Sequence, residues 1–478
     1  MNTSIRIYQT HIEVYPYSKG DSERLEKSLS IYNKAYYRWD AIAYYIANNT
    51  LYLPKGISLN LLQREFNSLP IPMPKTDEYA NIKYGEILVE PKSSMQKDAI
   101  DFLTAEEGFS DYKGKSQFML NLDTGDGKTV AAIAAILKYG YRAIIITHRD
   151  MIKEQWIETL KTKTTVKKRQ ILDVHSWNID NILNGKEKER DFYIVNHQTL
   201  KAYARNHGWE SISELFKKIK VGIKVVDEAH WFFNSTLMID YYTNTLLSFY
   251  LTATFGRAMI PENGIFKKAF YSAARFGEET FNYEDKRKHI NLIITYFKSH
   301  PGDRIPSVRT KMGFSAYKYI DYELNEEYSS LEYVVKKIIK ETSHLEGRTL
   351  IISPKIDSAD YFANLISNFI GEKVGTVHSA NSEETNIKNG SMKYISSTPG
   401  SLGAGVNLQG LRVLINLEPM GRISMDQLRG RLREYSDDKE TYLFYPVDTS
   451  LPDVMSMVKK AMPMFRAKCK KIVALNID

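Results

Sequence analysis

The stretch NLDTGDGKTV contains a Gly-x-Gly-Lys-Thr pattern whose residue types could bind phosphate. Gly125 and Gly127 would let backbone amides converge on phosphate oxygens, and a helix that follows would add the positive end of its dipole. Lys128 would reach the β- and γ-phosphates, and Thr129 would ligate Mg²⁺. The alternative is an ordinary strand–helix turn with a chance Gly-Lys-Thr, because Leu122 stands where the full pattern has glycine.

A second group of reactive side chains ends the apolar stretch KVVDEAH. Asp227 would hold Mg²⁺, and Glu228 would polarise a water molecule. The spacing from Lys128 to Asp227 fits two strands of one sheet with two strand–helix units between them. The alternative is the acidic first turn of a helix. The apolar run over 223–226 favours a buried strand whose carboxyl end carries ligands.

The elements that must position these residues follow an α/β rhythm from about residue 90 onward. Continuous apolar runs alternate with helical patterns, which predicts parallel sheets covered by helices on both faces. The runs of a first block are SQFMLNL, RAIIIT, FYIVN, GIKVVDEAH and FYLTAT, and those of a second block are HINLIITYF, RTLIIS, VGTVH, MKYISST, RVLINL and ETYLFYPV.

The N-terminal region has a different texture, because it is rich in tyrosine and reads as short strands. Residues 47–50, ANNT, are typical of a hairpin turn, and Ser58 is a candidate cap for a helix over LNLLQREF. The proline-rich residues 69–75 read as a linker. We therefore expect a small α+β domain over 1–85, lobes over 86–285 and 286–450, and a basic helical segment over 451–478.

Composition places the chain among globular proteins of the cytoplasm. Apolar residues make up 43% of the 478 residues and charged residues 26%. We find no apolar stretch long enough to span a membrane and no signal-peptide pattern. Cys469 is the single cysteine, which excludes internal disulfides and cysteine zinc sites. The net charge of +8 suits a polyanionic partner, and equally a solvated surface with a small excess of lysine.

The downstream motifs resemble those of superfamily 2 helicases and translocases. DEAH at 227–230 and TAT at 252–254 are similar to motifs II and III. The remaining motifs follow in order: Gln96 resembles the adenine-reading glutamine, 147–156 motif Ia, 195–200 motif Ic, 350–355 motif IV, 397–407 motif V and 427–433 motif VI. The resemblance covers roughly residues 90–450, and an ordered set is more specific than any single motif.

The resemblance implies two RecA-like lobes, with ATP and Mg²⁺ as cofactors. It implies these nucleotide contacts: Gln96, Thr124, Gly125, Asp126, Gly127, Lys128, Thr129, Gly405 and Asn407. It assigns Mg²⁺ to Thr129 and Asp227, hydrolysis to Lys128, Glu228, Gln427, Arg431 and Arg433, and coupling of nucleotide state to lobe closure to His230, Thr252 and Thr254. It assigns nucleic-acid backbone contacts to His148, Arg149, His197, Gln198, Thr199 and Lys355.

Motif VI also has a chemical rationale, since arginine is always charged and planar and suits a phosphoryl group in transfer. The chain departs from the family pattern in three places. Leu122 heads the phosphate loop, and Asn407 stands where many relatives have aspartate. Arg433 comes one position early, with Glu434 at the usual place, a spacing that resembles RNA-sensing helicases. Either Arg431 or Arg433 is therefore the candidate arginine finger.

The N-terminal region resembles the small domain of phage UvsW-type helicases, on the stretch YYRWDAIAYYIANNTLYLPKGISLNLLQREF. That family remodels branched DNA by fork regression, branch migration and 3′-to-5′ unwinding. Trp39 with its neighbouring arginine and tyrosines mixes cations and aromatics, as a single-strand or junction-binding face would. The alternative is that Trp39 and most tyrosines form the core of this small domain.

These observations predict an ATP-dependent DNA helicase or translocase that unwinds or migrates forks and Holliday junctions in replication, recombination or repair. We expect a monomer, in the host-cell cytoplasm if the chain is phage-encoded. The alternatives are an RNA-directed helicase, the translocase subunit of a restriction system, and a non-motor clamp that binds ATP without productive turnover. Basic clusters over 161–169 and 186–190 could extend a phosphate-tracking surface. Residues 302–319 could form a separating hairpin or an ordinary surface insertion.

Overall fold

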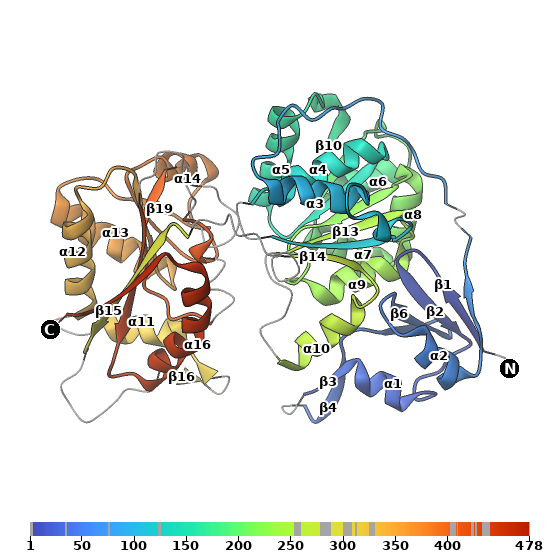
Figure 1. Cartoon of the computed structure of the whole chain (residues 1–478), viewed down its shortest axis with the longest axis horizontal. Helices are drawn as coiled ribbons and strands as arrows, with labels where there is room; N and C mark the ends of the chain where they lie inside the picture. Colours follow the sequence, from blue (N-terminus) through green and yellow to red (C-terminus); the bar gives the residue numbers. More distant parts are fainter. Residues whose placement is uncertain are drawn as a thin grey trace. The chain divides into compact units, whose positions relative to one another are not determined.

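The computed structural model of the chain forms two compact units, Met1–Tyr283 and Glu284–Asp478 (Figure 1). The structure describes residues 3–33, 36–74, 77–122, 126–252, 260–277, 288–299, 308–310, 313–324, 330–401, 408, 410–421, 425, 428–432 and 440–477.

The N-terminal part of the first unit is a five-stranded sheet in the order β5-β6-β2-β1-β7, with a β3–β4 hairpin and two helices. Its elements are β1 Ser4–Ile7, β2 His11–Tyr15, α1 Glu23–Ser28, β3 Ser30–Asn33, β4 Arg38–Ala41, β5 Tyr45–Ala47, β6 Thr50–Pro54, α2 Leu59–Phe66 and β7 Pro70–Pro72. Asn48 and Asn49 have φ of 49° and 56° and form the predicted turn. Ser58 accepts a hydrogen bond from the amide of Leu61, which confirms the cap of α2.

Three residues of the proline-rich segment, Pro70–Pro72, form strand β7, where the composition had predicted a linker. Residues of β7 pair in parallel with β1, with Ile5 opposite Pro70 and Ile7 opposite Pro72. The strand lies at the edge of the sheet, where a residue without an amide hydrogen removes no hydrogen bond from the ladder. The proline-rich composition therefore coincides with an edge strand of the N-terminal sheet.

The rest of the first unit is a seven-stranded parallel sheet in the order β10-β11-β9-β12-β13-β8-β14. Its strands are β8 Gln117–Asn121, β9 Ala143–Thr147, β10 Ile171–Val174, β11 Phe192–Asn196, β12 Ile223–Val226, β13 Leu247–Thr252 and β14 Ala274–Gly277. Its helices are α3 Ser94–Thr104, α4 Lys128–Tyr139, α5 Asp150–Lys163, α6 Ser176–Leu183, α7 His197–His207, α8 Glu210–Ile219, α9 Phe233–Tyr242 and α10 Ile260–Ala269, with short 3₁₀ turns η1 Ser110–Tyr112 and η2 Lys168–Gln170.

Three strands, and not two, separate the phosphate loop from Asp227, since β9, β10 and β11 all lie between β8 and β12 in the chain. The missing strand was β10. It is short, lies at the edge of the sheet and contains the half-exposed Asp173, so it presents no continuous apolar run. The edge strand β14 escaped prediction for the same reason.

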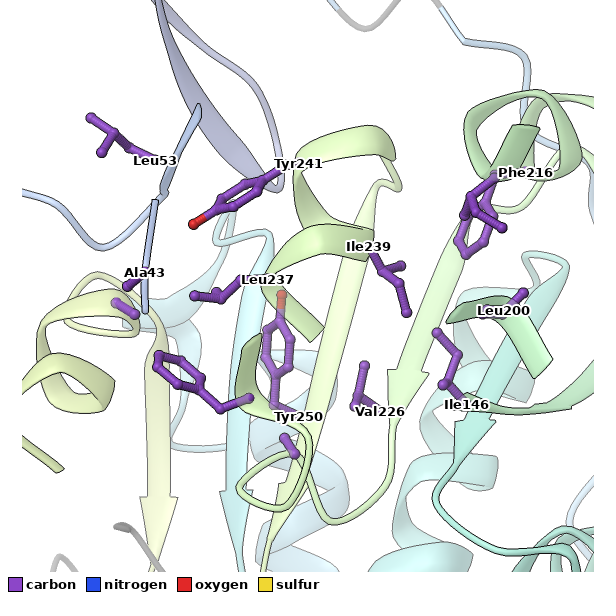
Figure 2. Close-up of a cluster of buried hydrophobic side chains, with 14 of the residues drawn as sticks. Ala43, Leu53, Ile146, Leu200, Phe216, Val226, Leu237, Ile239, Tyr241 and Tyr250 are labelled. Atoms are coloured by element: carbon purple, nitrogen blue, oxygen red, sulfur yellow. The ribbon is translucent and has the colours of Figure 1, made fainter. Parts of the chain in front are cut away.

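One face of this sheet continues into the core of the N-terminal module. Alternate strand residues point to opposite faces. Helices α3, α4 and α5 cover one face, and α6 to α10 cover the other. On the second face Leu237, Tyr241 and Tyr250 share a buried cluster with Ala43 and Leu53 of the module (Figure 2). The module and the sheet are thus held by one apolar core.

The second unit is also a seven-stranded parallel sheet, in the order β19-β20-β18-β21-β22-β15-β23. Its strands are β15 Ile290–Phe297, β18 Arg348–Ile352, β19 Gly375–Val377, β20 Tyr394–Ser397, β21 Leu411–Asn416, β22 Thr441–Asp448 and β23 Lys471–Asn476. Its helices are α11 Ala316–Leu324, α12 Ser330–Thr342, α13 Ile356–Ile370, α14 Glu383–Gly390 and α16 Pro452–Lys468. Helices α12 and α13 pack on one face of the sheet, and α16 packs on the other.

Two segments of the second unit, 451–478 and 302–319, add to what the sequence predicted. The C-terminal segment forms a helix only as far as Lys468. It then returns as β23, which pairs with β15, since a sheet edge offers hydrogen-bond partners to an extended chain. Within 302–319 the described residues form a small antiparallel pair, β16 Arg309–Thr310 with β17 Gly313–Phe314. The guanidinium of Arg309 binds the carboxylate of Asp453 at the start of α16, with one N···O distance of 2.6 Å.

Candidate active site

The phosphate loop lies between β8 and α4, as the sequence predicted. Gly127 has φ of +88°, a conformation that side chains rarely adopt. A Cβ atom there would lie 2.0 Å from Nε2 of Gln96. Leu122 is fully buried in the core, its amide donates to the carbonyl of Thr252 at 3.2 Å, and its carbonyl remains in the loop. A leucine is tolerated at the head of this loop because its side chain packs inward.

Gln96 joins the start of α3 to the phosphate loop. Its Oε1 accepts from the amide of Lys92 at 2.8 Å, and its Nε2 donates to the carbonyl of Gly127 at 3.1 Å. The side chain is 2% exposed. Both ends of the amide are thus bound to backbone groups, so Gln96 fixes the loop in this structure, and adenine reading stays a prediction for it.

Lys128 lies at the first position of α4 with its ammonium group inside the site. Its Nζ donates to the carbonyl of Leu122 at 2.8 Å and lies 3.9 Å from Oε1 of Glu228. The cation of the loop therefore faces the carboxylate at the end of β12, across the end of the intervening strand β13. Thr129 follows on the same first turn and is half-buried.

Asp227 is held by a residue that sequence reasoning did not assign. The indole Nε1 of the buried Trp156 on α5 donates to its Oδ2 at 2.8 Å, and the amide of Glu228 donates to its Oδ1 at 3.0 Å. Burial, with the negative charge of Glu228 adding to it, raises the pKa of Asp227 to about 6. The sequence offered one signal for Trp156: it is the tryptophan that ends the 147–156 motif, and no role was assigned to it.

Glu228 has a backbone φ of +51°, which is unusual for a residue with a side chain and is typical of functional sites. Its Oε2 lies 3.3 Å from Nδ1 of His230, which in turn is 2.9 Å from the hydroxyl of Thr252. Lys128, Glu228, His230 and Thr252 therefore form one connected group. The structure brings together these candidates from motifs I, II and III.

The residues present fit a nucleotide with its metal ion. The pKa of Asp227 is raised by burial and, to a smaller extent, by the charge of Glu228, so a divalent cation bound there would favour the ionised form. Asp227 and Thr129 supply the oxygen ligands that Mg²⁺ prefers. Lys128 and the amides at the start of α4 supply positive charge for phosphate. ATP would bring the phosphoryl group to this place.

The expected nucleic-acid contacts of the first unit lie at the carboxyl edge of the same sheet. His148 and Arg149 follow β9, and Gln198 and Thr199 lie on the first turn of α7 after β11. Gln198 is exposed, whereas His148 is 6% exposed and its ring is parallel to that of Trp231 at 6.3 Å. Burial lowers the pKa of Arg149.

His197 lies inside the protein, unlike its neighbours. It is 2% exposed, its ring stacks on Phe232 at 5.0 Å, and neither ring nitrogen has a hydrogen-bond partner among the described residues. Burial, with Lys201 and His148 adding to it, lowers the pKa of His197 to about 4. In this structure its imidazole faces the core, so a direct contact with a phosphate requires a rearrangement.

The basic clusters lie at the opposite edge of the sheet. Residues 161–169 end α5 and precede β10, and residues 186–190 precede β11. In a parallel sheet, segments that precede strands meet at the amino edge, whereas the candidate site lies at the carboxyl edge. These lysines therefore do not extend the surface on which the motifs lie.

Two of the candidates in the second unit lie among the described residues, Lys355 and Arg431. Nζ of Lys355 pairs with the carboxylate of Asp321 and lies 5.6 Å from the centre of the Tyr317 ring. Arg431 is 9% exposed. The remaining candidates lie outside the described residues: Thr124, Gly125, Thr254, Gly405, Asn407, Gln427 and Arg433. Asp126, which precedes Gly127, is described and half-buried.

Trp39 does not belong to the core of the N-terminal module. It is 49% exposed on the β3–β4 hairpin and meets the half-exposed Tyr32 edge-on at 5.4 Å. Tyr36 and Tyr37 are 71% and 83% exposed, and the guanidinium of Arg38 lies 5.5 Å from the centre of the Tyr36 ring. The hairpin therefore presents aromatic faces and a cation to solvent, and the core alternative does not hold for Trp39.

Comparisons with known proteins match the motifs and the fold. Residues 91–257 match the family described as Type III restriction enzyme, res subunit. A transcript termination protein of Yaba monkey tumor virus is 24% identical over 417 residues, which are 82% of this chain and 81% of the relative. A protein of Acanthamoeba polyphaga mimivirus, named as a candidate ATP-dependent RNA helicase, is 24% identical over 353 residues, 70% of this chain and 60% of the relative.

A solved structure of an S. cerevisiae Dbp5 variant bound to Gle1 and IP6 has the same fold. Its TM-score is 0.50 at 13% identity, over 81% of this chain and 89% of that chain. The two parallel sheets therefore have the fold of RecA-like lobes, and residues 91–257 are similar to the res-subunit family. Within the described residues, no helix combines the length and the apolar character needed to cross a membrane.

Proposed function

We propose that this superfamily 2 helicase-like chain hydrolyses ATP to move along nucleic acid, and that its substrate is branched DNA. The observation that carries the proposal is the connected group of Lys128, Glu228, His230 and Thr252 beside Asp227. This group links a phosphate-binding lysine to two carboxylates and to the end of strand β13. A site that only binds phosphate needs the lysine, and needs neither the carboxylates nor the link to β13.

Each residue has a role that its position supports. Lys128 neutralises charge on the phosphates, and Asp227 with Thr129 holds Mg²⁺. Glu228 orients and deprotonates the attacking water, a task that suits a carboxylate 3.9 Å from the lysine of the phosphate loop. His230 and Thr252 transmit the state of the site to the end of β13. Roles in hydrolysis are likewise proposed for Gln427, Arg431 and Arg433 of the second unit.

The nucleic-acid contacts are proposed along the carboxyl edge of the first lobe. His148, Arg149, Gln198 and Thr199 would touch the backbone of one strand, and Lys355 would do so from the second lobe after release from Asp321. His197 would support this surface from below. Contacts of this kind are electrostatic, so binding should weaken steeply with salt and show little sequence preference.

The branched substrate is proposed on the N-terminal hairpin. Trp39, Tyr36 and Arg38 could stack on unpaired bases where strands separate. The resemblance of this module to UvsW-type helicases supports the same role. We propose the 1–85 module, the two lobes and the 451–478 segment as its working parts, acting as a monomer in the cytoplasm of the host cell.

RNA is the second candidate substrate. The names of the two viral relatives, a transcript termination protein and a candidate RNA helicase, favour it, as does the arginine spacing of motif VI. The res-subunit family match favours a translocase on linear duplex DNA. These alternatives share the ATP site and differ only in the nucleic acid that stimulates it.

The test is ATP hydrolysis without nucleic acid and with single-stranded DNA, RNA, linear duplex or a four-way junction, beside Lys128→Ala. Stimulation that is strongest with the junction and absent in the variant supports the proposal. Stimulation by RNA alone transfers it to an RNA helicase, and by linear duplex alone to a restriction-type translocase. Hydrolysis indifferent to every nucleic acid refutes a motor.

A further inference from the structure

Four strands of the first sheet end within one residue of one another at its carboxyl edge. Val174, Val195, Ile146 and Val226 are register partners across β10, β11, β9 and β12, and β9 and β11 continue for one more residue. The segments that follow these strands therefore leave the sheet at nearly the same height. His175 follows β10, and Asp227 of the ATP site follows β12. They are separated by three strand spacings, about 14 Å.

The segment after β10 carries an exposed aromatic pair that the proposed mechanism does not use. Trp177 is 68% exposed, which makes it the most exposed of the five tryptophans. Its ring is parallel to that of His175, at an interplanar angle of 9° and a centroid distance of 6.1 Å. The His175 side chain is itself 44% exposed. Burial does not account for a tryptophan in this position.

The pair is held in place by buried contacts beneath it. The side chain of Asn178 is 1% exposed, accepts from the amide of His175 at 2.9 Å and donates to the carbonyl of Asp173 at 2.9 Å. These bonds fix the first turn of α6, on which Trp177 lies. Nε2 of His175 also lies 3.2 Å from Oδ2 of Asp173. A preorganised aromatic face loses little entropy when a planar ligand stacks on it.

The charges around the pair favour a base over a phosphate as its ligand. Lys153 contacts the same Asp173 as His175 does, is 3% exposed, and pairs with Asp173 at 2.7 Å and Asp150 at 3.4 Å. This cation is neutralised, so it offers no free charge to a phosphate beside the ring face. Aromatic faces bind bases of single strands without regard to sequence.

We infer that the His175–Trp177 pair is a stacking subsite for a base of single-stranded nucleic acid that runs along the carboxyl edge of the first lobe. This rests on the proposed function. The strand would pass from the ends of β12 and β9, over the exposed Gln198, to the pair at the outer edge strand β10. Trp177 thereby anchors the strand by its bases, whereas the residues between contact its backbone.

The test compares the full chain with Trp177→Ala, Trp177→Phe and Tyr271→Ala by fluorescence anisotropy. The probes are labelled oligothymidylate, oligouridylate, and abasic strands of the same lengths. Tyr271 is the matched control, since it is 75% exposed and precedes β14, at the opposite edge of the sheet. Circular dichroism establishes that all variants are folded.

Trp177→Ala is expected to weaken binding of a base-bearing strand by at least about fivefold, the lower end of the contribution of one stacked base. Its affinity for the abasic strand should equal that of the wild type, and Trp177→Phe should restore most of the loss. An equal loss on both kinds of strand, or no loss at all, overturns the inference while the motor proposal stands. A wild-type chain that binds none of the strands overturns both.

Discussion

At the scale of single residues, Glu228 lies between the cation of Lys128 and the imidazole of His230. Its backbone is held in the left-handed region, at a cost of roughly 1–3 kcal/mol that the surrounding strand ends must offset. A carboxylate placed in this way is in contact with the phosphate loop and with the link to β13. A substitution of Glu228 can therefore separate ATP hydrolysis from ATP binding.

Glu228→Gln is expected to retain ATP binding and to lower stimulated ATP hydrolysis by about 10²–10⁴-fold, because the amide cannot accept a proton from water. Hydrolysis and binding of a fluorescent ATP analogue are measured together. Glu106→Gln, a change of the same kind on the surface, should leave both unaltered. Full activity of Glu228→Gln would refute the assigned role and favour a clamp that does not turn over ATP.

His197 gives the fold a pH dependence whose sign is fixed by its lowered pKa. The folded-state pKa of about 4 lies below the ordinary value of 6.5, so the unfolded chain takes up a proton that the folded chain refuses. Stability is complete above pH 6.5 and is lost as the pH falls towards 4, by about 2 kcal/mol at pH 5.

His197→Leu should therefore show a smaller drop in melting temperature between pH 8 and pH 5 than the wild type. His207→Leu changes an exposed histidine at the other end of the same helix, and should keep the wild-type drop. The melting temperature of each protein is measured by circular dichroism at both pH values. Identical drops in all three proteins would contradict a buried neutral His197.

At the scale of elements, α5 connects two parts of the site that lie apart in the chain. It begins after His148 and Arg149 at the carboxyl edge, and one side of it carries Trp156 to Asp227. Movement of this helix would therefore change the orientation of a candidate metal ligand. The bond from Trp156 is the contact through which the helix and the carboxylate are joined.

Trp156→Phe keeps the ring in the core and removes only the donor to Asp227. ATP hydrolysis at limiting Mg²⁺ is expected to fall about tenfold or more, the usual effect of losing a partner of a metal ligand, and high Mg²⁺ should restore part of it. Trp209→Phe, remote from Asp227 and stacked on Tyr242, is the matched control. An unchanged Mg²⁺ dependence would show that the indole has no influence on the site.

At the scale of the whole chain, the first unit contains two regions of different composition, the tyrosine-rich N-terminal module and the α/β lobe, which share one core. Leu53 of the module is fully buried in the cluster that also contains Tyr241 and Tyr250 of the lobe (Figure 2). The amide of Gly56 donates to the carbonyl of Ala269 at 3.1 Å, and a Cβ atom on Gly56 would lie 2.3 Å from that oxygen. The module and the first lobe are therefore expected to unfold together.

Leu53→Ala should destabilise that joint transition by about 2–5 kcal/mol through the cavity it leaves. The transition whose melting temperature falls in Leu53→Ala should be the same one whose melting temperature ATP raises. Thermal melting with and without nucleotide measures both. Leu69→Ala removes the same atoms from a side chain that is 69% exposed, and should have little effect. A new early transition that ATP does not shift would mean that the module unfolds independently.

The sequence by itself determined the parts whose physics is local. Buried parallel strands read as continuous apolar runs, so the central strands of both sheets and the order of the motifs were predictable. The Asn48–Asn49 turn and the Ser58 cap followed from backbone preferences of single residues. Lys128, Asp227 and Glu228 became candidates through residue type and through their place after a predicted strand, and the structure brings them close together. Their roles stay a prediction.

Only the tertiary structure decided what depends on neighbours distant in the chain. Edge strands β7, β10 and β14 lack a continuous apolar run. Their pairing, and that of the edge strand β23, appears only in the assembled sheets. The burial of His197, the exposure of Trp39 and Trp177, and the bond from Trp156 to Asp227 are set by which faces meet. Residue type alone states what a side chain can do, whereas burial and partners decide what it does.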